Sequence, residues 1–280
     1  MDTKKYKWQI RDGEIGLQER THIMGILNVT PDSFSDAGHF HDLNKAVEQA
    51  LLIEQEGADL IDIGGESTRP GSEPVTENEE LDRVIPVIEK LVPLLKIPIS
   101  IDTYKSGVAA KALNAGAKIV NDISGLQFDP EMAKVVANNN AGIVIMHIKG
   151  TPRDMQKNPQ YTDLIEEIID YFHKSITIAH QAGIDNRQIV IDPGIGFGKK
   201  LQDNFEIIKE LRQFQSLNCP VLVGPSRKSF IGNTLGLPVD QRLEGTIASC
   251  VACILNGANI LRVHDVKQIK RAAIIADNIK

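Results

Sequence analysis

Short apolar runs recur along the chain, and each is followed by a polar residue that begins a loop. The first run ends at Leu27 and gives way to the polar segment NVTPDSFSD, and the last ends at Val263. The polar residues that follow the eight runs are, in chain order, Asn28, Asp62, Asp102, Asn121, His147, Asp192, Lys228 and His264. Runs of this length and composition predict buried β-strands. In a parallel barrel the carboxyl ends of all strands meet on one face, so the pattern predicts one site built from eight loops.

Longer segments with apolar residues at helical spacing separate these runs. They cover residues 43–56, 77–95, 105–115, 130–138, 164–182, 204–214, 242–256 and 266–279. Several end at a glycine that suits a helix C-cap: Gly57, Gly116, Gly183 and Gly257. Regular alternation of strand and helix predicts a parallel sheet covered by helices. Eight repeats favour an α/β fold that closes into a single (β/α)8 TIM barrel over an open, doubly wound sheet.

The first twenty residues follow a different pattern. Tyr6, Trp8 and Ile10 alternate with polar residues, an Asp-Gly pair follows, and Ile15 and Leu17 resume the alternation. This pattern predicts an N-terminal β-hairpin. We expect residues 1–20 to form this hairpin and close the bottom of the barrel, and residues 21–280 to form the barrel itself. No linker or low-complexity tract divides the chain, so we expect one domain.

Composition narrows the class of protein. The 280 residues suit one α/β barrel, and a net charge of -6 gives no basic field for nucleic acid. No apolar segment approaches the ~20 residues of a membrane span, and the N-terminus has no secretory signal pattern. The three cysteines, Cys219, Cys250 and Cys253, are an odd number. We therefore expect reduced, buried thiols in a cytoplasmic protein, with no nucleic-acid or membrane partner.

The carboxylates and the amide at the strand ends suggest a ligand. Asp62, Asp102, Asp192 and Asn121 are each explained as readily by a loop hydrogen bond or a helix cap when taken singly. Together at one barrel mouth, they match a flat heterocycle with an amino-amide edge, because a carboxylate accepts two N–H bonds and an amide both donates and accepts. Asp62 has an alternative role, which is to hold the loop that follows it.

Cationic residues stand at neighbouring loop tips. They are Arg69, His147, Lys228, Arg262 and His264. Such groups hold phosphate or stack on a ring, and the alternative is a salt bridge to Asp102, Asp122 or Asp265. Lys228 and Ser229 stand at the start of a helix, where free N–H groups bind anions, although neither glycine-rich segment nearby matches a nucleotide-binding motif. A zinc pattern is lacking, whereas a diphosphate would bring Mg²⁺, for which we expect Asn28 and Asp36 as ligands.

Eight sequence motifs resemble those of one family, the dihydropteroate synthases. They are MGILNVTPDSFSD, DIGGESTRPGS, ISIDTYK, IVNDISG, MHIKGTP, IDPGIGFGK, GPSRKSFIG and RVHDV. The resemblance runs from Ile23 to the last helix. It implies an alkyl-transferring enzyme of folate biosynthesis, which condenses 6-hydroxymethyl-7,8-dihydropterin diphosphate with p-aminobenzoate to give 7,8-dihydropteroate and pyrophosphate. It also implies Mg²⁺ assistance, dissociative loss of pyrophosphate, and competition by sulfonamides for the p-aminobenzoate site.

The resemblance implies roles for particular residues. Pterin binding would fall to Asp102, Asn121, Met146, Asp192, Phe197, Lys228 and Arg262. The p-aminobenzoate site would use Phe34, Thr68, Arg69, Pro70, Lys228 and Ser229. Pyrophosphate would contact Asn28, Arg262 and His264, and the metal would bind Asn28 and Asp36. The catalytic residues would be Asp102, Lys228, Arg262 and His264.

Two other functions fit parts of this pattern. A methyltetrahydrofolate-binding domain of a corrinoid methyltransferase has a similar barrel and pterin-binding set, but it does not need NVTPDSFSD or STRPG. A non-catalytic pterin-binding paralogue would be expected to have lost diphosphate or loop residues, which this chain retains. The resemblance also implies a homodimer formed through outer helices late in the chain. Ile247, Val251 and Ile254 suit such an interface, and core packing explains them equally well.

Overall fold

The computed structural model describes residues 6–30, 38–69 and 71–280, and its centre is an eight-stranded parallel sheet. In chain order the strands are β3 (His22–Asn28), β4 (Leu60–Gly64), β5 (Ile99–Asp102), β6 (Ile119–Asp122), β7 (Gly142–Met146), β8 (Ile189–Asp192), β9 (Leu222–Val223) and β10 (Ile260–Val263). The strand order is β8-β7-β6-β5-β4-β3-β10-β9. A parallel bridge between Ile191 and Val221 joins the two ends of this order. The predicted closed barrel is confirmed.

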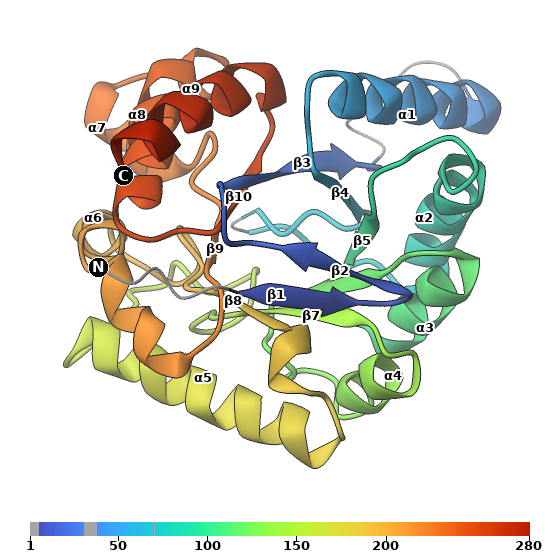
Figure 1. Ribbon diagram of the computed structural model, residues 1–280, viewed down its shortest axis with the longest axis horizontal. Helices are drawn as coiled ribbons and strands as arrows, with labels where there is room; N and C mark the ends of the chain where they lie inside the picture. The colour runs from blue at the N-terminus through green and yellow to red at the C-terminus, as the bar shows by residue number, and fades with distance from the viewer. Residues whose placement is uncertain (1–5, 31–37, 70) are drawn as a thin grey trace.

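Helices surround the barrel (Figure 1). They are α1 (Gly38–Gln55), α2 (Glu77–Leu91), α3 (Ser106–Ala115), α4 (Met132–Asn138), α5 (Leu164–Gln181), α6 (Leu201–Lys209), α7 (Ser229–Leu235), α8 (Leu243–Leu255) and α9 (Val266–Ile279). The prediction was wrong at 204–214, where α6 begins earlier and gives way to a 3-10 helix over Leu211–Leu217. It also gave no range for α7, because a seven-residue helix that ends at Gly236, with φ of +69°, shows too few turns of apolar periodicity.

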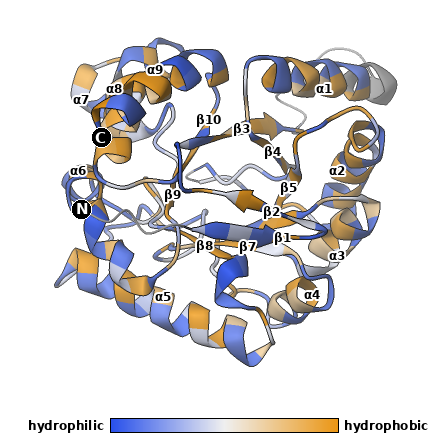
Figure 2. Ribbon diagram, viewed as in Figure 1, coloured by the Kyte–Doolittle hydropathy of each residue, from blue (hydrophilic) through white to orange (hydrophobic). Residues whose placement is uncertain are grey.

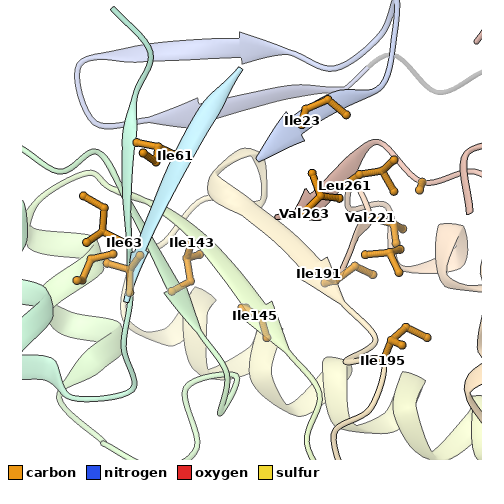
Figure 3. Close-up of a cluster of buried hydrophobic side chains, with 14 of the residues drawn as sticks. Ile23, Ile61, Ile63, Ile143, Ile145, Ile191, Ile195, Val221, Leu261 and Val263 are labelled. Carbon is orange, nitrogen blue, oxygen red and sulfur yellow. The ribbon is translucent and has the colours of Figure 1, made fainter. Parts of the chain in front are cut away.

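Alternation along each strand sorts side chains into two cores. Residues that point outward, such as Ile61, Ile63 and Ile145, are fully buried against the helices (Figure 3). Helix α5 shows the matching pattern, with hydrophobic and hydrophilic stretches alternating along it (Figure 2). Residues that point inward fill the lower part of the barrel: Met24, Leu60, Ile119, Val144, Val190, Leu222 and Ile260. The barrel is therefore packed below its mouth, so ligands can reach only the carboxyl ends of the strands.

The N-terminal hairpin covers the opposite end of the barrel. Strands β1 (Lys7–Ile10) and β2 (Gly13–Gly16) pair antiparallel, as the alternation predicts, and lie across the barrel in Figure 1. Trp8 is fully buried within the inward-facing apolar cluster, and its Nε1 donates a hydrogen bond to the Gln188 carbonyl oxygen over 2.8 Å. The hairpin thus seals the bottom of the barrel and leaves the mouth as the place for chemistry.

Within the described ranges, no helix is both long enough and apolar enough to cross a lipid bilayer. The three cysteines, Cys219, Cys250 and Cys253, are buried and unpaired, as expected. Cys250 and Cys253 lie on α8 with their side chains in the outer core. Their C-x-x-C spacing places both thiols on the core-facing side of the helix, where they are not joined in a disulfide.

Candidate active site

A polar layer lies above the inward apolar layer. In the strand register, Gly64 on β4 pairs with Asp102 on β5, and Asp102 pairs with Asn121 on β6. Asp192 ends β8, and Arg262 on β10 also faces inward, since it alternates with the inward-facing Ile260. Side chains along a strand alternate between the two faces, so the residue two positions after an inward-facing apolar residue also points inward. On most of the strands that residue is polar, and it lies at the mouth. The structure thus brings together four of the predicted residues: Asp102, Asn121, Asp192 and Arg262.

Arg262 connects the carboxylates of Asp62 and Asp102. Its Nε donates to Oδ2 of Asp62 over 2.7 Å, and its Nη2 donates to Oδ2 of Asp102 over 2.6 Å. Burial alone would lower the pKa of Arg262, but Asp62 and Asp102 outweigh burial and raise it. Burial raises the pKa of Asp102 to about 7, although Arg262 opposes the shift. The guanidinium is thus held flat across the barrel interior with its charge permanently in place.

Asp192 faces the mouth, and no ion pair joins its carboxylate to a cation among the described residues, although Lys228, Lys199 and Arg262 are near enough to favour its ionised form. The side chain is 5% exposed, and its Oδ1 accepts a hydrogen bond from the Gly194 backbone N–H over 2.8 Å. Burial raises the pKa of Asp192 to about 6, and the Gly194 bond opposes the shift. At neutral pH this carboxylate is ionised in a dry setting. It is therefore well placed to accept two N–H bonds from a ligand ring.

Lys228 and Phe197 form a second wall of the site. Nζ of Lys228 lies 4.0 Å from the centroid of the Phe197 ring, within cation–π range. Burial lowers the pKa of Lys228 to about 8, and Arg262 adds to the shift. Phe197 packs with Met146, Ile123, Ile148 and Met155 in a small apolar cluster that is separate from the two main cores. An apolar surface beside a lysine donor suits a flat, polar-edged ring.

His264 follows β10 and is held by Ser226. The His264 backbone N–H donates to Ser226 Oγ over 3.2 Å, and the same Oγ lies 3.0 Å from Nδ1 of the ring. Burial lowers the pKa of His264 to about 3, and Arg262 adds to the shift. The imidazole is therefore neutral. Ser226 Oγ accepts from the backbone and still carries its own proton, which it can donate to Nδ1; in that tautomer Nε2–H is the donor available to an anion.

The remaining predicted residues lie at the rim. Asn28 is the last residue of β3 and pairs with Gly64 on β4. Its amide oxygen lies beside Gly64, 3.9 Å from the position that a Cβ atom on that glycine would occupy. Thr68 is half-buried on the β4–α2 loop, while Arg69 and Ser229 are exposed, Ser229 as the first residue of α7. The predicted site residues Phe34, Asp36 and Pro70 lie outside the described residues. The rim therefore contributes polar and cationic groups around the inner set.

Two contacts correct or extend the sequence-based set. His147, one of the candidate phosphate-binding or ring-stacking groups, is 4% exposed and faces Lys199, whose Nζ lies 2.8 Å from Nδ1 of the ring. Sequence reasoning missed Lys199 and also Lys105, which pairs with Glu66 and with Glu80. Both lysines lie inside motifs, IDPGIGFGK and ISIDTYK, and that position is the signal that could have found them.

Among the described residues, no group of three or more His, Cys, Asp or Glu side chains could hold a metal. Asn28 offers a single amide oxygen, a hard ligand of the type that Mg²⁺ accepts. The described part of the site therefore fits a metal that arrives on an anionic ligand and does not fit a preformed protein cage.

Comparison with known proteins identifies the family. Residues 24–264 match the family of pterin-binding enzymes. The chain is 49% identical to the dihydropteroate synthase of Synechocystis sp. over 92% of this chain and 90% of the relative, and 49% identical to that of Bacillus subtilis over 94% and 90%. The chain belongs to the dihydropteroate synthase family. The resemblance drawn from eight motifs is confirmed.

Solved structures of dihydropteroate synthases share the architecture. The enzyme of Xanthomonas albilineans with 4-aminobenzoic acid superposes with a TM-score of 0.92 at 41% identity, covering 99% of this chain and 98% of that one. The enzyme of Clostridium difficile in the presence of pteroic acid gives 0.89 at 49% identity, covering 93% and 97%. The enzyme of Yersinia pestis with a sulfonamide drug gives 0.91 at 42%, covering 98% of both. The barrel described above is thus the family's fold.

Proposed function

We propose that this chain catalyses dihydropteroate synthesis, in which the amine of p-aminobenzoate displaces pyrophosphate from 6-hydroxymethyl-7,8-dihydropterin diphosphate. The observation that carries the proposal is the inner set of Asp102, Asn121, Asp192, Lys228 and Arg262 at one barrel mouth. Relatives with the same fold have been solved with 4-aminobenzoic acid and with 7,8-dihydropteroate, which are a substrate and a product of this reaction.

The pterin is expected to lie between the carboxylates and the Phe197 wall. Asp192 would accept from the 2-amino group and the adjacent ring N–H, with one oxygen already on the Gly194 N–H. Lys228, protonated below its pKa of about 8, would donate to the ring. Met146 and Phe197, which belong to the same small apolar cluster, would pack on the ring. Asn121, Asp102 and Arg262 would close the remaining side.

The diphosphate is expected beside Arg262, His264 and Asn28. Arg262 keeps its charge at all relevant pH values, and the neutral His264 would offer Nε2–H as a donor when Ser226 donates to Nδ1. The residues fit Mg²⁺ that enters with the diphosphate, with Asn28 and Asp36 as its proposed protein ligands. When bound, the metal would neutralise charge that develops on the departing pyrophosphate. In many enzymes, electrostatic stabilisation of the charge that develops in the transition state lowers the activation barrier more than any other single effect.

The amine substrate is expected at the rim, where Thr68, Arg69 and Ser229 lie, with Phe34 and Pro70 as further proposed contacts. Its amino group is neutral near pH 7, so the reaction needs no strong general base. We infer a dissociative order in which the carbon–oxygen bond breaks first and the resulting pterin cation is stabilised by nearby carboxylates. Asp102 is the carboxylate we assign to this role. Loops after β3 and β4 would exclude water, which would otherwise trap the cation.

The same proposal includes a cytoplasmic homodimer. Three unpaired, buried thiols suit a reducing compartment. For the dimer, Ile254 is fully buried in the core, and Ile247 and Val251 pack against that core, so these residues argue less for an interface than expected. Helix α9 instead exposes large apolar side chains: Ile274, Ile275 and Ile279. These suit burial by a second copy of the chain.

The deciding experiment measures pyrophosphate release from the pterin diphosphate with Mg²⁺, with and without p-aminobenzoate. Amine-dependent release together with dihydropteroate formation is the expected result. Pterin binding without any pyrophosphate release would overturn the proposal. Methyltetrahydrofolate would then be the next ligand to measure, since a methyl-transfer domain shares the barrel and the pterin-binding carboxylates.

A further inference from the structure

We propose that Asp62 is a positioning residue that fixes the orientations of Asn121 and Arg262 for the pterin ring. Asp62 lies on β4, two residues before Gly64, and it is fully buried. In the strand register Asp62 pairs with Ser100 on β5, whereas Asp102, two residues further along β5, pairs with Asn121. The side chain of Asp62 therefore lies one inward-facing layer below those of Asp102 and Asn121. Asp62 therefore lies beneath the ligand-facing layer, and it acts through other side chains without touching the ligand.

A single oxygen of Asp62 accepts two hydrogen bonds. Oδ2 receives the Nδ2–H of Asn121 over 2.9 Å and the Nε–H of Arg262 over 2.7 Å. Asn121 is 4% exposed, and it lies on β6 while Arg262 lies on β10, across the barrel interior. No other described side chain accepts hydrogen bonds from both. Removal of this one carboxylate would therefore release two ligand-facing groups at once.

The carboxylate decides which way the Asn121 amide points. The Asp62 oxygen that pairs with Arg262 is the acceptor, so Asn121 turns Nδ2 towards it. Oδ1 and the second Nδ2–H are then left for a ligand, with Oδ1 as a fixed acceptor. Without Asp62, Asn121 would lose the contact that favours this amide orientation. Arg262 is constrained similarly, since Nε is taken by Asp62 and Nη2 by Asp102, which leaves Nη1 free for a ligand.

This inference rests on the proposed pterin site, but its test can be separated from synthase activity. The probe is 6-hydroxymethyl-7,8-dihydropterin, which lacks the diphosphate and so reports on the ring alone. For Asp62→Asn we expect calorimetric binding to weaken about ten- to hundredfold, because a charged hydrogen-bond acceptor is replaced by a neutral amide that can flip. KM for p-aminobenzoate should stay within about twofold, since that substrate occupies the rim.

Ser100→Ala is the matched control. Ser100 is fully buried on the neighbouring strand at the same level, and its Oγ has no partner, so this variant changes the same region without changing Asn121 or Arg262. Its pterin affinity should equal that of the wild type. Equal losses in Asp62→Asn and Ser100→Ala would overturn the inference, and so would an Asp62→Asn variant that binds the pterin normally.

A second measurement needs no ligand. The side-chain amide signal of Asn121, assigned by its loss in Asn121→Ala, should show one orientation with slow hydrogen exchange in the wild type and fast exchange in Asp62→Asn. Unchanged exchange would overturn the inference. If the wild type fails to bind the pterin, the proposed function fails, while this amide signal still decides whether Asp62 holds Asn121.

Discussion

Nζ of Lys199 lies 2.8 Å from Nδ1 of His147, and both side chains are buried. Lys199 also donates to the Phe197 carbonyl oxygen over 2.9 Å. The two segments that carry these residues lie in backbone contact, since a Cβ on Gly194 would collide with the His147 carbonyl oxygen. The pair therefore ties the loop after β8 to the end of β7, directly behind the Phe197 wall of the pterin site.

This pairing predicts a specific pH dependence of stability. Burial lowers the pKa of Lys199 to about 7, although Asp192 opposes the shift, whereas the unfolded chain keeps Lys199 protonated up to about 10.5. Between these values the unfolded state binds the extra proton, so the free energy of unfolding should rise with pH. Relative to Lys199→Met, the wild type should gain up to about 4 kcal/mol between pH 7 and pH 10.

Urea unfolding at four pH values from 7 to 10 measures this gain. Lys209→Met is the control, because that lysine is on the surface with 81% of its side chain exposed and should give a curve parallel to the wild type. A Lys199→Met curve that also runs parallel to the wild type would show that the buried lysine does not release its proton.

Asp192→Asn should separate stability from function. Burial raises the pKa of Asp192 from 3.8 to about 6, so between these values the folded state retains a proton that the unfolded chain has lost. Stability from this group therefore falls as pH rises from 4 to 6 and stays reduced above pH 6. Asparagine keeps the acceptor for Gly194 without the charge, so the variant should be more stable at pH 8 by up to about 3 kcal/mol.

The same variant should lose most pterin binding and turnover, because its oxygen stays on the Gly194 N–H and an NH2 donor replaces the second acceptor oxygen that would face the ring N–H groups. Unfolding curves at pH 4 and pH 8, with calorimetry of the pterin, check both halves of this prediction. If the variant turns over substrate at a near-normal rate, Asp192 does not have the proposed role in pterin binding.

Lys105 is expected to support the amine side of the site. It pairs with Glu66 and, over 2.5 Å, with the buried Glu80, while the Tyr104 hydroxyl donates to Glu66 over 2.9 Å. Lys105→Met would leave two carboxylates without their cation and cost about 3 kcal/mol. Glu66 begins the loop that carries Thr68, so KM for p-aminobenzoate should rise more than KM for the pterin diphosphate.

Steady-state kinetics with each substrate varied in turn measure this difference, and thermal unfolding gives the loss of stability. Lys105→Arg keeps the charge and should recover most of both. Equal increases of the two KM values would instead indicate a general loss of structure.

The period-two pattern of the strands predicted most of the site. Asp102, Asn121 and Asp192 follow apolar runs directly, and because parallel strands align their carboxyl ends, their placement at one mouth follows from strand order alone. The barrel was predictable for the same reason, since eight similar repeats leave few ways to pack. Residue roles remain predictions at this level, because alternation places a side chain without naming its partner.

Long-range pairings between charged side chains were not predictable. Lys199 and His147 are 52 residues apart, and Lys105 and Glu66 are 39 apart, in loops where no periodicity applies. Which cation meets which carboxylate depends on barrel curvature and on the depth at which each strand ends. Asp62 illustrates the point: it follows an apolar run as Asp102 does, yet it lies one level lower and bonds to Asn121 as well as to Arg262.

Trp8 provides a prediction at the opposite end of the barrel. It is the chain's one tryptophan, fully buried among the inward-facing residues, with Nε1 bonded to the Gln188 carbonyl oxygen. Trp8→Ala should cost about 4 kcal/mol of stability, because a large cavity opens below the barrel. Trp8→Phe keeps most of the packing and loses mainly one hydrogen bond, at about 1 kcal/mol. Both variants should keep wild-type kcat below their unfolding temperatures, since the apolar layer separates Trp8 from the mouth. A lower kcat in Trp8→Phe at unchanged stability would mean that the hairpin communicates with the active site.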